Sequence, residues 1–202
     1  MLSFLPAPLR GLLAFLVMAL NTIIAIVPLL IITLFRLAIP VKAWGKLCAW
    51  LLIKIAESWI FVNGVALSLS GKAQIDLQGA DDLHYQGWYL VSCNHQSWSD
   101  ILILQQVFNR KVPMLKFFLK QELIWVPLMG VAWWALDFPF MKRHSKEFLE
   151  KHPELKGKDL ETTQKACEKF KELPVSVMNF LEGTRFTKAK HDAQGSPYQH
   201  LL

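Results

Sequence analysis

Two residues in this sequence have types and a spacing that suit proton transfer, namely His95 and Asp100, five residues apart. His95 follows the apolar run 88–93, which predicts a buried strand, and Asp100 falls in the first turn of a helix that Ser97 or Ser99 caps. The carboxylate can therefore meet one imidazole nitrogen and leave the other free to take a proton from a hydroxyl. By itself the pair is weak evidence, because such spacings also occur without function.

A second candidate site is the tetrapeptide Glu182-Gly183-Thr184-Arg185. Glycine lets the backbone approach a ligand, threonine supplies a hydroxyl, and arginine supplies a planar fork suited to phosphate. The plain alternative is a β-turn with an exposed arginine. Lys142-Arg143 form a third candidate, either for the same phosphate or as the solvated start of a helix.

The elements that must position these residues alternate between strands and helices. Strands are predicted at 59–69, 88–93, 112–119, 137–141 and 174–181, and helices at about 97–108 and 159–173, with a solvated connection over 142–158. This alternation predicts an α/β domain with a mainly parallel sheet flanked by helices. Asn94-His95 and Glu182–Arg185 both begin where a strand ends, and functional loops lie at the carboxyl ends of parallel strands.

A membrane segment is predicted near the N-terminus, where residues 11–35 carry no formal charge. About 20 apolar residues suffice to cross the hydrocarbon core. Asn21-Thr22 and Pro28 interrupt the run, which leaves open a kinked single span or a re-entrant hairpin. More basic residues follow the segment than precede it, which places the bulk of the chain in the cytoplasm.

Two further apolar stretches are expected to lie at or near the membrane surface. Residues 41–57 read as an amphipathic helix, either in the membrane interface or packed on the domain. Residues 123–136 contain Trp125, Trp133 and Trp134 but are short for a span, so a buried or half-immersed helix is expected.

Composition narrows the class of partner. The net charge of +6 suits nucleic acid or anionic lipid, and the eight tryptophans and 53% hydrophobic residues favour lipid. No nucleic-acid-binding module is recognisable, so a nucleic-acid partner is not expected. The three scattered cysteines argue against a disulfide framework, and neither they nor the histidines have the spacing of metal ligands.

Three ordered blocks resemble those of one enzyme family. Asn94-His95-Gln96-Ser97-Trp98-Ser99-Asp100, Phe138-Pro139-Phe140-Met141-Lys142-Arg143 and Phe180-Leu181-Glu182-Gly183-Thr184-Arg185 are similar to the first, second and third motifs of the 1-acylglycerol-3-phosphate (lysophospholipid, PlsC-like) acyltransferases. The resemblance covers about residues 90–187. It looks closest to the bacterial YihG-like inner-membrane branch, with a similar form in the eukaryotic lysocardiolipin-type branch.

The resemblance implies a reaction and a role for each residue. His95 would act as general base on the free hydroxyl of a lysophospholipid, with Asp100 supporting it, and the hydroxyl would attack the thioester of acyl-CoA or acyl carrier protein. Asn94, Lys142, Arg143 and Glu182–Arg185 would hold the acceptor head group, while backbone amides after Asn94 are candidates for the oxyanion. Neither a metal nor an organic cofactor is implied.

We therefore expect residues 1–57 to form a membrane segment with an interfacial helix, and residues 58–202 to form a catalytic domain shortened at its C-terminus, since family members run further. The default acceptor is 1-acylglycerol-3-phosphate, giving phosphatidic acid at the bacterial inner membrane, with the catalytic domain facing the cytoplasm. The alternatives are another acceptor, such as lysocardiolipin or lysophosphatidylglycerol, or an anionic-lipid-binding membrane protein without turnover.

Overall fold

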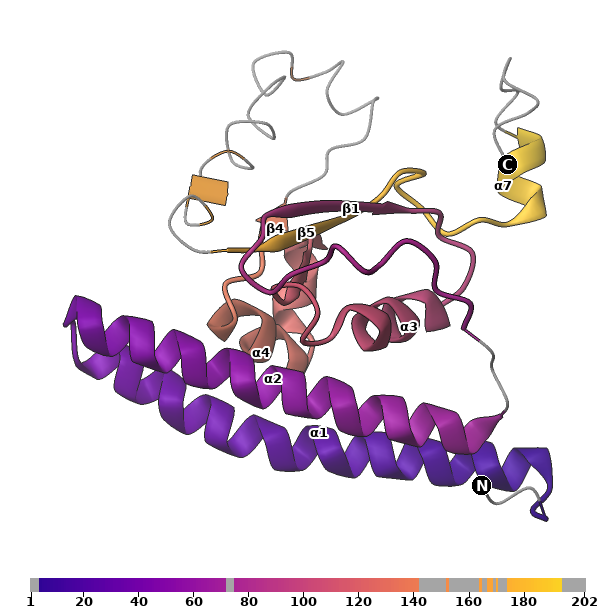
Figure 1. Ribbon diagram of the computed structural model, residues 1–202, viewed down its shortest axis with the longest axis horizontal. Coiled ribbons are helices and arrows are strands. Elements are labelled where there is room, and N and C mark those ends of the chain that lie inside the picture. The colour runs from indigo at the N-terminus through magenta and orange to yellow at the C-terminus, as the bar shows by residue number, and fades with distance from the viewer. Residues whose placement is uncertain are drawn as a thin grey trace.

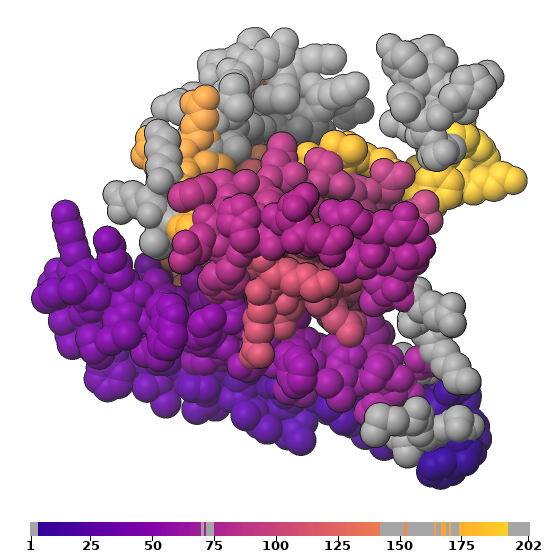
Figure 2. Space-filling model, in the orientation of Figure 1, coloured from indigo at the N-terminus to yellow at the C-terminus, as the bar shows by residue number. Residues whose placement is uncertain are grey.

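The computed structural model describes residues 4–71, 75–141, 152, 164, 167–168, 170 and 174–193. Two long helices lie along one side of the molecule, and a sheet with shorter helices lies above them (Figure 1). Figure 2 shows the helix pair as a continuous base under the rest of the chain. The chain therefore forms a helical layer packed against an α/β layer.

The helical layer consists of α1 (Ala7–Ala38) and α2 (Lys42–Ser70). Only residues 39–41 connect the two helices, so they run antiparallel, and the Trp44 indole N–H donates to the Phe35 carbonyl at 3.1 Å across the turn. Helix α1 continues through Pro28 without ending. A hairpin within residues 11–35 is therefore excluded, and the helix pair forms because the chain turns after this segment.

Polar side chains in the middle of the apolar segment join the two helices. The Asn21 amide donates to the Trp59 carbonyl and to Asn63 Oδ1, both at 2.9 Å. The Trp59 indole N–H donates to Thr22 Oγ1 at 3.0 Å. These groups satisfy each other between the helices, as buried polar groups must. Asn21 and Thr22, which interrupt the apolar run in sequence, thus mark the contact with α2.

The strand predicted at 59–69 is wrong, because these residues belong to α2. Their apolar and β-branched character suggested a strand, but burial follows helical spacing: Ala56, Ile60, Asn63 and Ala66 are all buried. The amphipathic helix predicted over 41–57 is accordingly the first part of a longer helix. Helix α2 also passes without a break through position 57, where the division into two parts was predicted.

The α/β layer is built on a three-stranded parallel sheet, as predicted. Its order is β1 (Tyr89–Cys93), β5 (Ser176–Phe180), β2 (Leu115–Phe117), so the last of the described strands lies in the middle. A second pair of parallel strands joins β3 (Leu119–Lys120) to β4 (Phe140–Met141). The strands expected at 112–119 and 137–141 are thus present but shorter than predicted.

Shorter helices follow or connect the strands. Helix α3 (Ser99–Phe108) follows β1, as predicted, and α7 (Lys188–Ala193) follows β5. The helix expected over 123–136 is divided into a 3-10 helix, η1 (Gln121–Trp125), and α4 (Met129–Ala135). Gly130 permits their close packing, because a Cβ there would lie 1.9 Å from the Ile124 carbonyl oxygen. The predicted helix 159–173 and connection 142–158 lie almost entirely outside the described residues.

One hydrophobic core joins the two layers. Its buried members come from both helices of the pair, from β2 and the residues before it, from β5, and from α4 and the segment after it: Ile26, Leu29, Leu52, Ala56, Val112, Leu115, Phe117, Ala132, Ala135, Leu136, Phe138 and Met178. Because the helix pair contributes to this core, it supports the sheet directly and does not act only as a tether.

A buried carboxylate fastens α2 to the α/β layer. Glu57 is 2% exposed, and its carboxylate accepts hydrogen bonds from Lys54 Nζ at 2.8 Å and from the Tyr85 hydroxyl. Arg110 Nε lies 3.9 Å from the same carboxylate, and the Asn109 amide donates to the Glu57 backbone carbonyl at 3.0 Å. Tyr85 precedes β1 and Asn109 follows α3, so this cluster ties three separate segments together.

Candidate active site

The parallel pairing of β1 with β5 brings the candidate residues to one place. Cys93 and Phe180 are partners in the register, so Asn94-His95 and Leu181-Glu182 leave the sheet side by side. The pairing continues past the strands, since the Leu181 N–H donates to the Cys93 carbonyl at 3.3 Å and the Phe186 N–H donates to the His95 carbonyl at 2.7 Å. The site therefore lies at the carboxyl ends of two neighbouring parallel strands.

His95 and Asp100 are in hydrogen-bonding contact. His95 Nδ1 lies 3.1 Å from Asp100 Oδ2, and the same oxygen accepts the backbone N–H groups of Gln96 at 2.8 Å and Ser97 at 2.7 Å. Partial burial would by itself raise the pKa of the Asp100 carboxyl, but the Ser97 amide, the His95 ring and the Gln96 amide lower that pKa below its usual value. The carboxylate is therefore ionised at neutral pH and holds the Nδ1–H tautomer of His95.

The imidazole is held from one side by an aromatic ring. The rings of His95 and Phe180 are stacked with centroids 4.0 Å apart and planes at 19°. Within the described part of the chain, His95 Nε2 makes no hydrogen bond. One nitrogen is thus fixed by Asp100, the ring face is fixed by Phe180, and Nε2 is available to a substrate hydroxyl.

Cys93 lies next to His95 without being suited to act as a nucleophile. Burial raises the pKa of its thiol, and the carboxylates of Asp100 and Glu182 raise it further. The thiol donates to the Asn94 carbonyl at 3.0 Å. Because the thiolate is the nucleophilic form, a protonated Cys93 is a poor nucleophile.

The turn after β5 supports the histidine loop. Glu182 Oε2 accepts the backbone N–H of His95 at 3.0 Å, which spans 87 positions of the sequence. The Gly183 N–H donates to the Phe180 carbonyl at 2.9 Å, and Gly183 has a φ of 65° that disfavours any residue with a Cβ. Glu182 and Gly183 were predicted to hold the acceptor, which stays a prediction. The contacts they make determine the geometry of the loop that carries His95.

Only some of the remaining predicted site residues lie in the described part of the chain. Asn94, Thr184 and Arg185 lie on the two adjoining loops, whereas Lys142 and Arg143 lie outside the described residues. The amides of Gln96 and Ser97 are engaged by Asp100, so these two candidates for oxyanion donors are already occupied. Within the described residues, no group of three or more His, Cys, Asp or Glu side chains is arranged to hold a metal ion.

Three contacts at the site were not predicted from the sequence. They are the Phe180 ring on His95, the Arg185 guanidinium above the Trp98 ring at 5.0 Å, and the Lys190 amine on Thr184 Oγ1 at 2.6 Å. Phe180 and Trp98 stand within the motif blocks, and Lys190 stands in the basic run after the third block. Residue type alone carried no signal of these pairings. The first two depend on how two distant loops are placed by the strand register, and the third depends on the position of α7.

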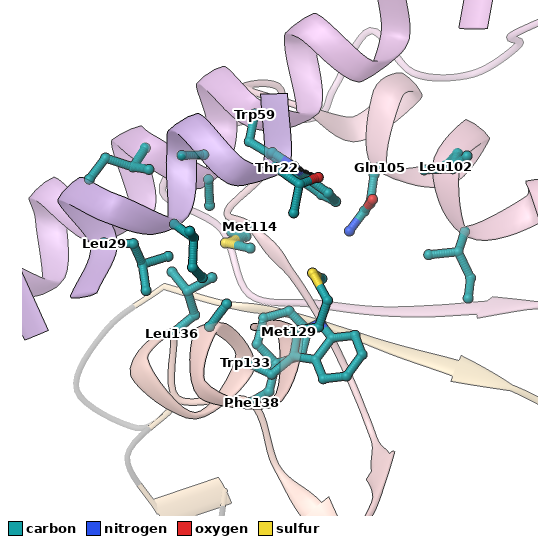
Figure 3. Close-up of a pocket in the computed structure, with 16 residues that line it drawn as sticks. Thr22, Leu29, Trp59, Leu102, Gln105, Met114, Met129, Trp133, Leu136 and Phe138 are labelled. Carbon is teal, nitrogen blue, oxygen red and sulfur yellow. Dashed lines mark hydrogen bonds between the residues drawn. The ribbon is translucent and has the colours of Figure 1, made fainter. Parts of the chain in front are cut away.

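An apolar cavity lies between the helix pair and α3, with a volume of about 180 Å³ (Figure 3). Ile101 and Leu102 line it from the turn of α3 that follows Asp100, and Ala25 and Ile26 line it from α1. Trp133 and Met129 enter it from α4. A hydrocarbon chain fits such a lining, and the cavity lies close in the sequence and in the fold to the His95–Asp100 pair.

Comparison with known proteins assigns the family. A model of the acyltransferase family matches residues 74–197, and the chain belongs to this family. Among solved structures, it is similar to the 1-acyl-sn-glycerophosphate (LPA) acyltransferase PlsC from Thermotoga maritima, with a TM-score of 0.52 and 20% identity over 91% of this chain and 65% of that one. This chain thus corresponds to about two thirds of that structure, and the likeness confirms the predicted fold. No curated protein sequence matches the chain.

Proposed function

We propose that this protein transfers a fatty acyl group from acyl-CoA or acyl carrier protein to the free hydroxyl of a lysophospholipid, with 1-acylglycerol-3-phosphate as the preferred acceptor. The observation that carries the proposal is the His95–Asp100 contact of 3.1 Å beside the loop that bears Arg185. A general base and a phosphate-binding arginine on adjoining loops match an acceptor whose hydroxyl and phosphate are joined by a short glycerol arm.

The reaction follows from the protonation state of the pair. His95 Nε2 accepts the proton of the acceptor hydroxyl as its oxygen attacks the thioester carbonyl, and Asp100 stabilises the imidazolium that forms. Collapse of the tetrahedral intermediate breaks the carbon–sulfur bond. The leaving thiolate takes the proton back from Nε2, so the products are an ester and a free thiol, and no external acid or base is consumed.

The apolar cavity gives one acyl chain a place outside water. Its lining from α1, α2, α3 and α4 is almost wholly apolar, and Thr22 and Gln105 are among its few polar members. Figure 3 shows Leu29, Met114 and Trp133 lying around it from three separate segments. We assign this cavity to an acyl chain, because burying each methylene contributes roughly 0.8 kcal/mol.

The helix pair supports placement at a membrane. Both helices are long and apolar enough to cross one, by length and composition only. Large apolar side chains are exposed along α1, including Phe15, Leu20, Ile24, Ile31 and Leu34. Exposed apolar side chains in this number fit a lipid contact. We place the protein at the cytoplasmic face of the bacterial inner membrane, as its basic residues suggest.

The test is acyl transfer by the full chain in membranes, with 1-acylglycerol-3-phosphate as acceptor and acyl-CoA or acyl carrier protein as donor. We expect phosphatidic acid from the wild-type protein and its loss by at least about a hundredfold in His95→Ala. The matched control is His84→Ala, since His84 contacts Tyr89 at the opposite end of β1. Full transfer by His95→Ala would contradict the general-base role. Tight lipid binding with no product from any donor would favour a non-catalytic lipid-binding protein.

A further inference from the structure

A second cation lies beside the turn that carries Arg185. Lys190 Nζ donates to Thr184 Oγ1 at 2.6 Å and to the Arg185 carbonyl at 3.4 Å. The start of α7 positions it: Thr187 Oγ1 accepts the Lys190 backbone N–H at 3.3 Å, and the Thr187 carbonyl accepts the His191 N–H at 3.0 Å. The lysine is thereby directed back over the turn after β5.

Arg185 is held in place by a flat aromatic surface. Its guanidinium carbon lies 5.0 Å from the centroid of the Trp98 ring, and Trp98 is 73% exposed. Such stacking orients the guanidinium while leaving its N–H groups free to donate. Trp98 belongs to the loop between His95 and Asp100, so the stack connects the arginine to the segment that carries the base.

Nearby carboxylates are committed to other partners. Glu182 accepts the His95 N–H, and Asp192 lies 3.1 Å from His191 Nδ1. Among the residues that the structure describes, neither Arg185 nor Lys190 forms an ion pair with a carboxylate. Two cations and the Thr184 hydroxyl thus face solvent next to the base without an acidic partner from this part of the chain.

This arrangement matches the charge of a phosphate monoester. A monoester carries about −1.5 to −2 charges near pH 7, because its second pKa is about 6. A phosphodiester head group carries a single charge and offers fewer oxygens to donors. Arg185 can bind one face of a phosphate as a fork, while Lys190 supplies a point charge to another.

We propose that Lys190 and Arg185, with Arg185 stacked on Trp98, form a two-cation site for a phosphate monoester, and that Lys190 selects monoester over diester ligands. The substrate part of this inference rests on the proposed acyl transfer. Such a phosphate has two sources, the head group of 1-acylglycerol-3-phosphate and the 3′-phosphate of an acyl-CoA donor. The acceptor is the expected source, since only its phosphate is joined to the reacting hydroxyl by a short arm.

The experiment compares Lys190→Ala, Lys190→Arg and the matched control Lys188→Ala in steady-state transfer by the full chain. Lys188 is exposed on the same helix and makes no contact with Thr184 among the described residues. The acceptors are 1-acylglycerol-3-phosphate and lysophosphatidylglycerol with the same acyl chain, and the donors are acyl-CoA and acyl-dephospho-CoA.

Loss of a charge-assisted hydrogen bond predicts that Lys190→Ala raises KM for the monoester acceptor roughly ten- to a hundredfold. We expect kcat and KM for lysophosphatidylglycerol to change by less than about twofold, Lys190→Arg to restore most of the affinity, and Lys188→Ala to have no effect. If the donor phosphate occupies the site, KM rises for acyl-CoA but not for acyl-dephospho-CoA. An equal rise for both acceptors, or the same rise in Lys188→Ala, overturns the proposal.

A binding measurement separates this proposal from the proposed function. Equilibrium binding of 1-acylglycerol-3-phosphate is measured on His95→Ala with and without Lys190→Ala, which needs no turnover. If no acyl transfer occurs in any assay but Lys190→Ala still weakens binding, the proposed function is wrong and the site stands. If acyl transfer occurs but Lys190→Ala alters neither KM nor binding, the function stands and the two-cation site is wrong.

Discussion

Asp100 and Glu57 are both carboxylates that accept several hydrogen bonds, and they lie in two contrasting regions of the molecule. Asp100 collects two backbone amides and the His95 ring at the open end of β1. Glu57 collects Lys54 and Tyr85 in the buried junction between α2 and the α/β layer. The number of hydrogen bonds does not distinguish them. Only Asp100 holds a group, His95, whose second ring nitrogen makes no hydrogen bond among the described residues.

The largest expected effect comes from Asp100→Asn. The amide side chain keeps the size of aspartate but removes the charge that stabilises the imidazolium and selects the Nδ1–H tautomer. We expect kcat to fall about a hundred- to ten-thousandfold, with a smaller loss of thermal stability than in Glu57→Gln. Steady-state acyl transfer and thermal unfolding of the same preparation measure the two quantities. A fall in melting temperature as large as that of Glu57→Gln would remove the contrast between the two carboxylates.

Glu57→Gln should show the reverse pattern. Losing the charge leaves Lys54 and Arg110 facing a neutral amide in a buried junction, which costs roughly 1–3 kcal/mol in the free energy of unfolding. Denaturant unfolding in detergent measures this cost, and kcat per folded molecule should stay within about twofold of the wild-type value. Glu122→Gln, on the exposed face of η1, is the control and should leave stability unchanged. A selective loss of kcat in Glu57→Gln would mean that the junction takes part in catalysis.

Ala132→Leu tests whether the apolar cavity holds the acyl chain. Ala132 lines the apolar cavity from α4, whereas its neighbour Val131 is exposed. Extra volume at position 132 should shorten the acyl chain that fits, lowering kcat/KM for long-chain substrates about tenfold relative to short-chain ones. A series of acyl-CoA and lysolipid chain lengths measures this, with Val131→Leu as the matched control. An unchanged chain-length profile would place the acyl chain elsewhere.

The smallest effect is a difference in pH dependence. Since native interactions lower the pKa of Asp100, its contribution to stability is present above about pH 4 and is lost as pH falls through the native pKa. For Tyr85, burial and the hydrogen bond to Glu57 raise the pKa, so its contribution is present below about pH 10 and is lost as pH rises further.

Unfolding curves from pH 3 to 11 separate these two contributions. Asp100→Asn should weaken the loss of stability in acid, and Tyr85→Phe should weaken the loss in alkali. If Asp100→Asn and Tyr85→Phe both changed the stability at the same end of the pH range, the two residues would not make separate contributions.

The α/β layer was predicted from the sequence more successfully than the helix pair. Strands β1 and β5 are short apolar runs that end in polar loops, and both were predicted, together with the helix that carries Asp100. Residues 59–69 were wrongly predicted as a strand, because the pattern of burial along α2 depends on its contact with α1. Local composition does not record which face another helix covers.

The candidate site was predicted through its blocks, while its contacts required the fold. His95, Asp100 and the turn from Glu182 to Arg185 were identified from residue types and order. The Phe180 stack and the Lys190 contact were not, because they follow from strand register and from the position of α7. Glu57 was also missed, since an isolated glutamate within an apolar helix gives no indication of partners at positions 85 and 110.

The order of strands in the sheet has a consequence for how the protein is made. Strand β5 lies between β1 and β2 although it is synthesised after both, and Glu182 reaches His95 across 87 positions. Chains emerge from the ribosome N-terminal end first, so α1 and α2 are available to meet lipid while β1 and β2 still lack the strand that separates them. The base and its supporting turn come together only when β5 is inserted. On the membrane placement and function proposed above, a nascent chain reaches the membrane before its candidate active site has formed.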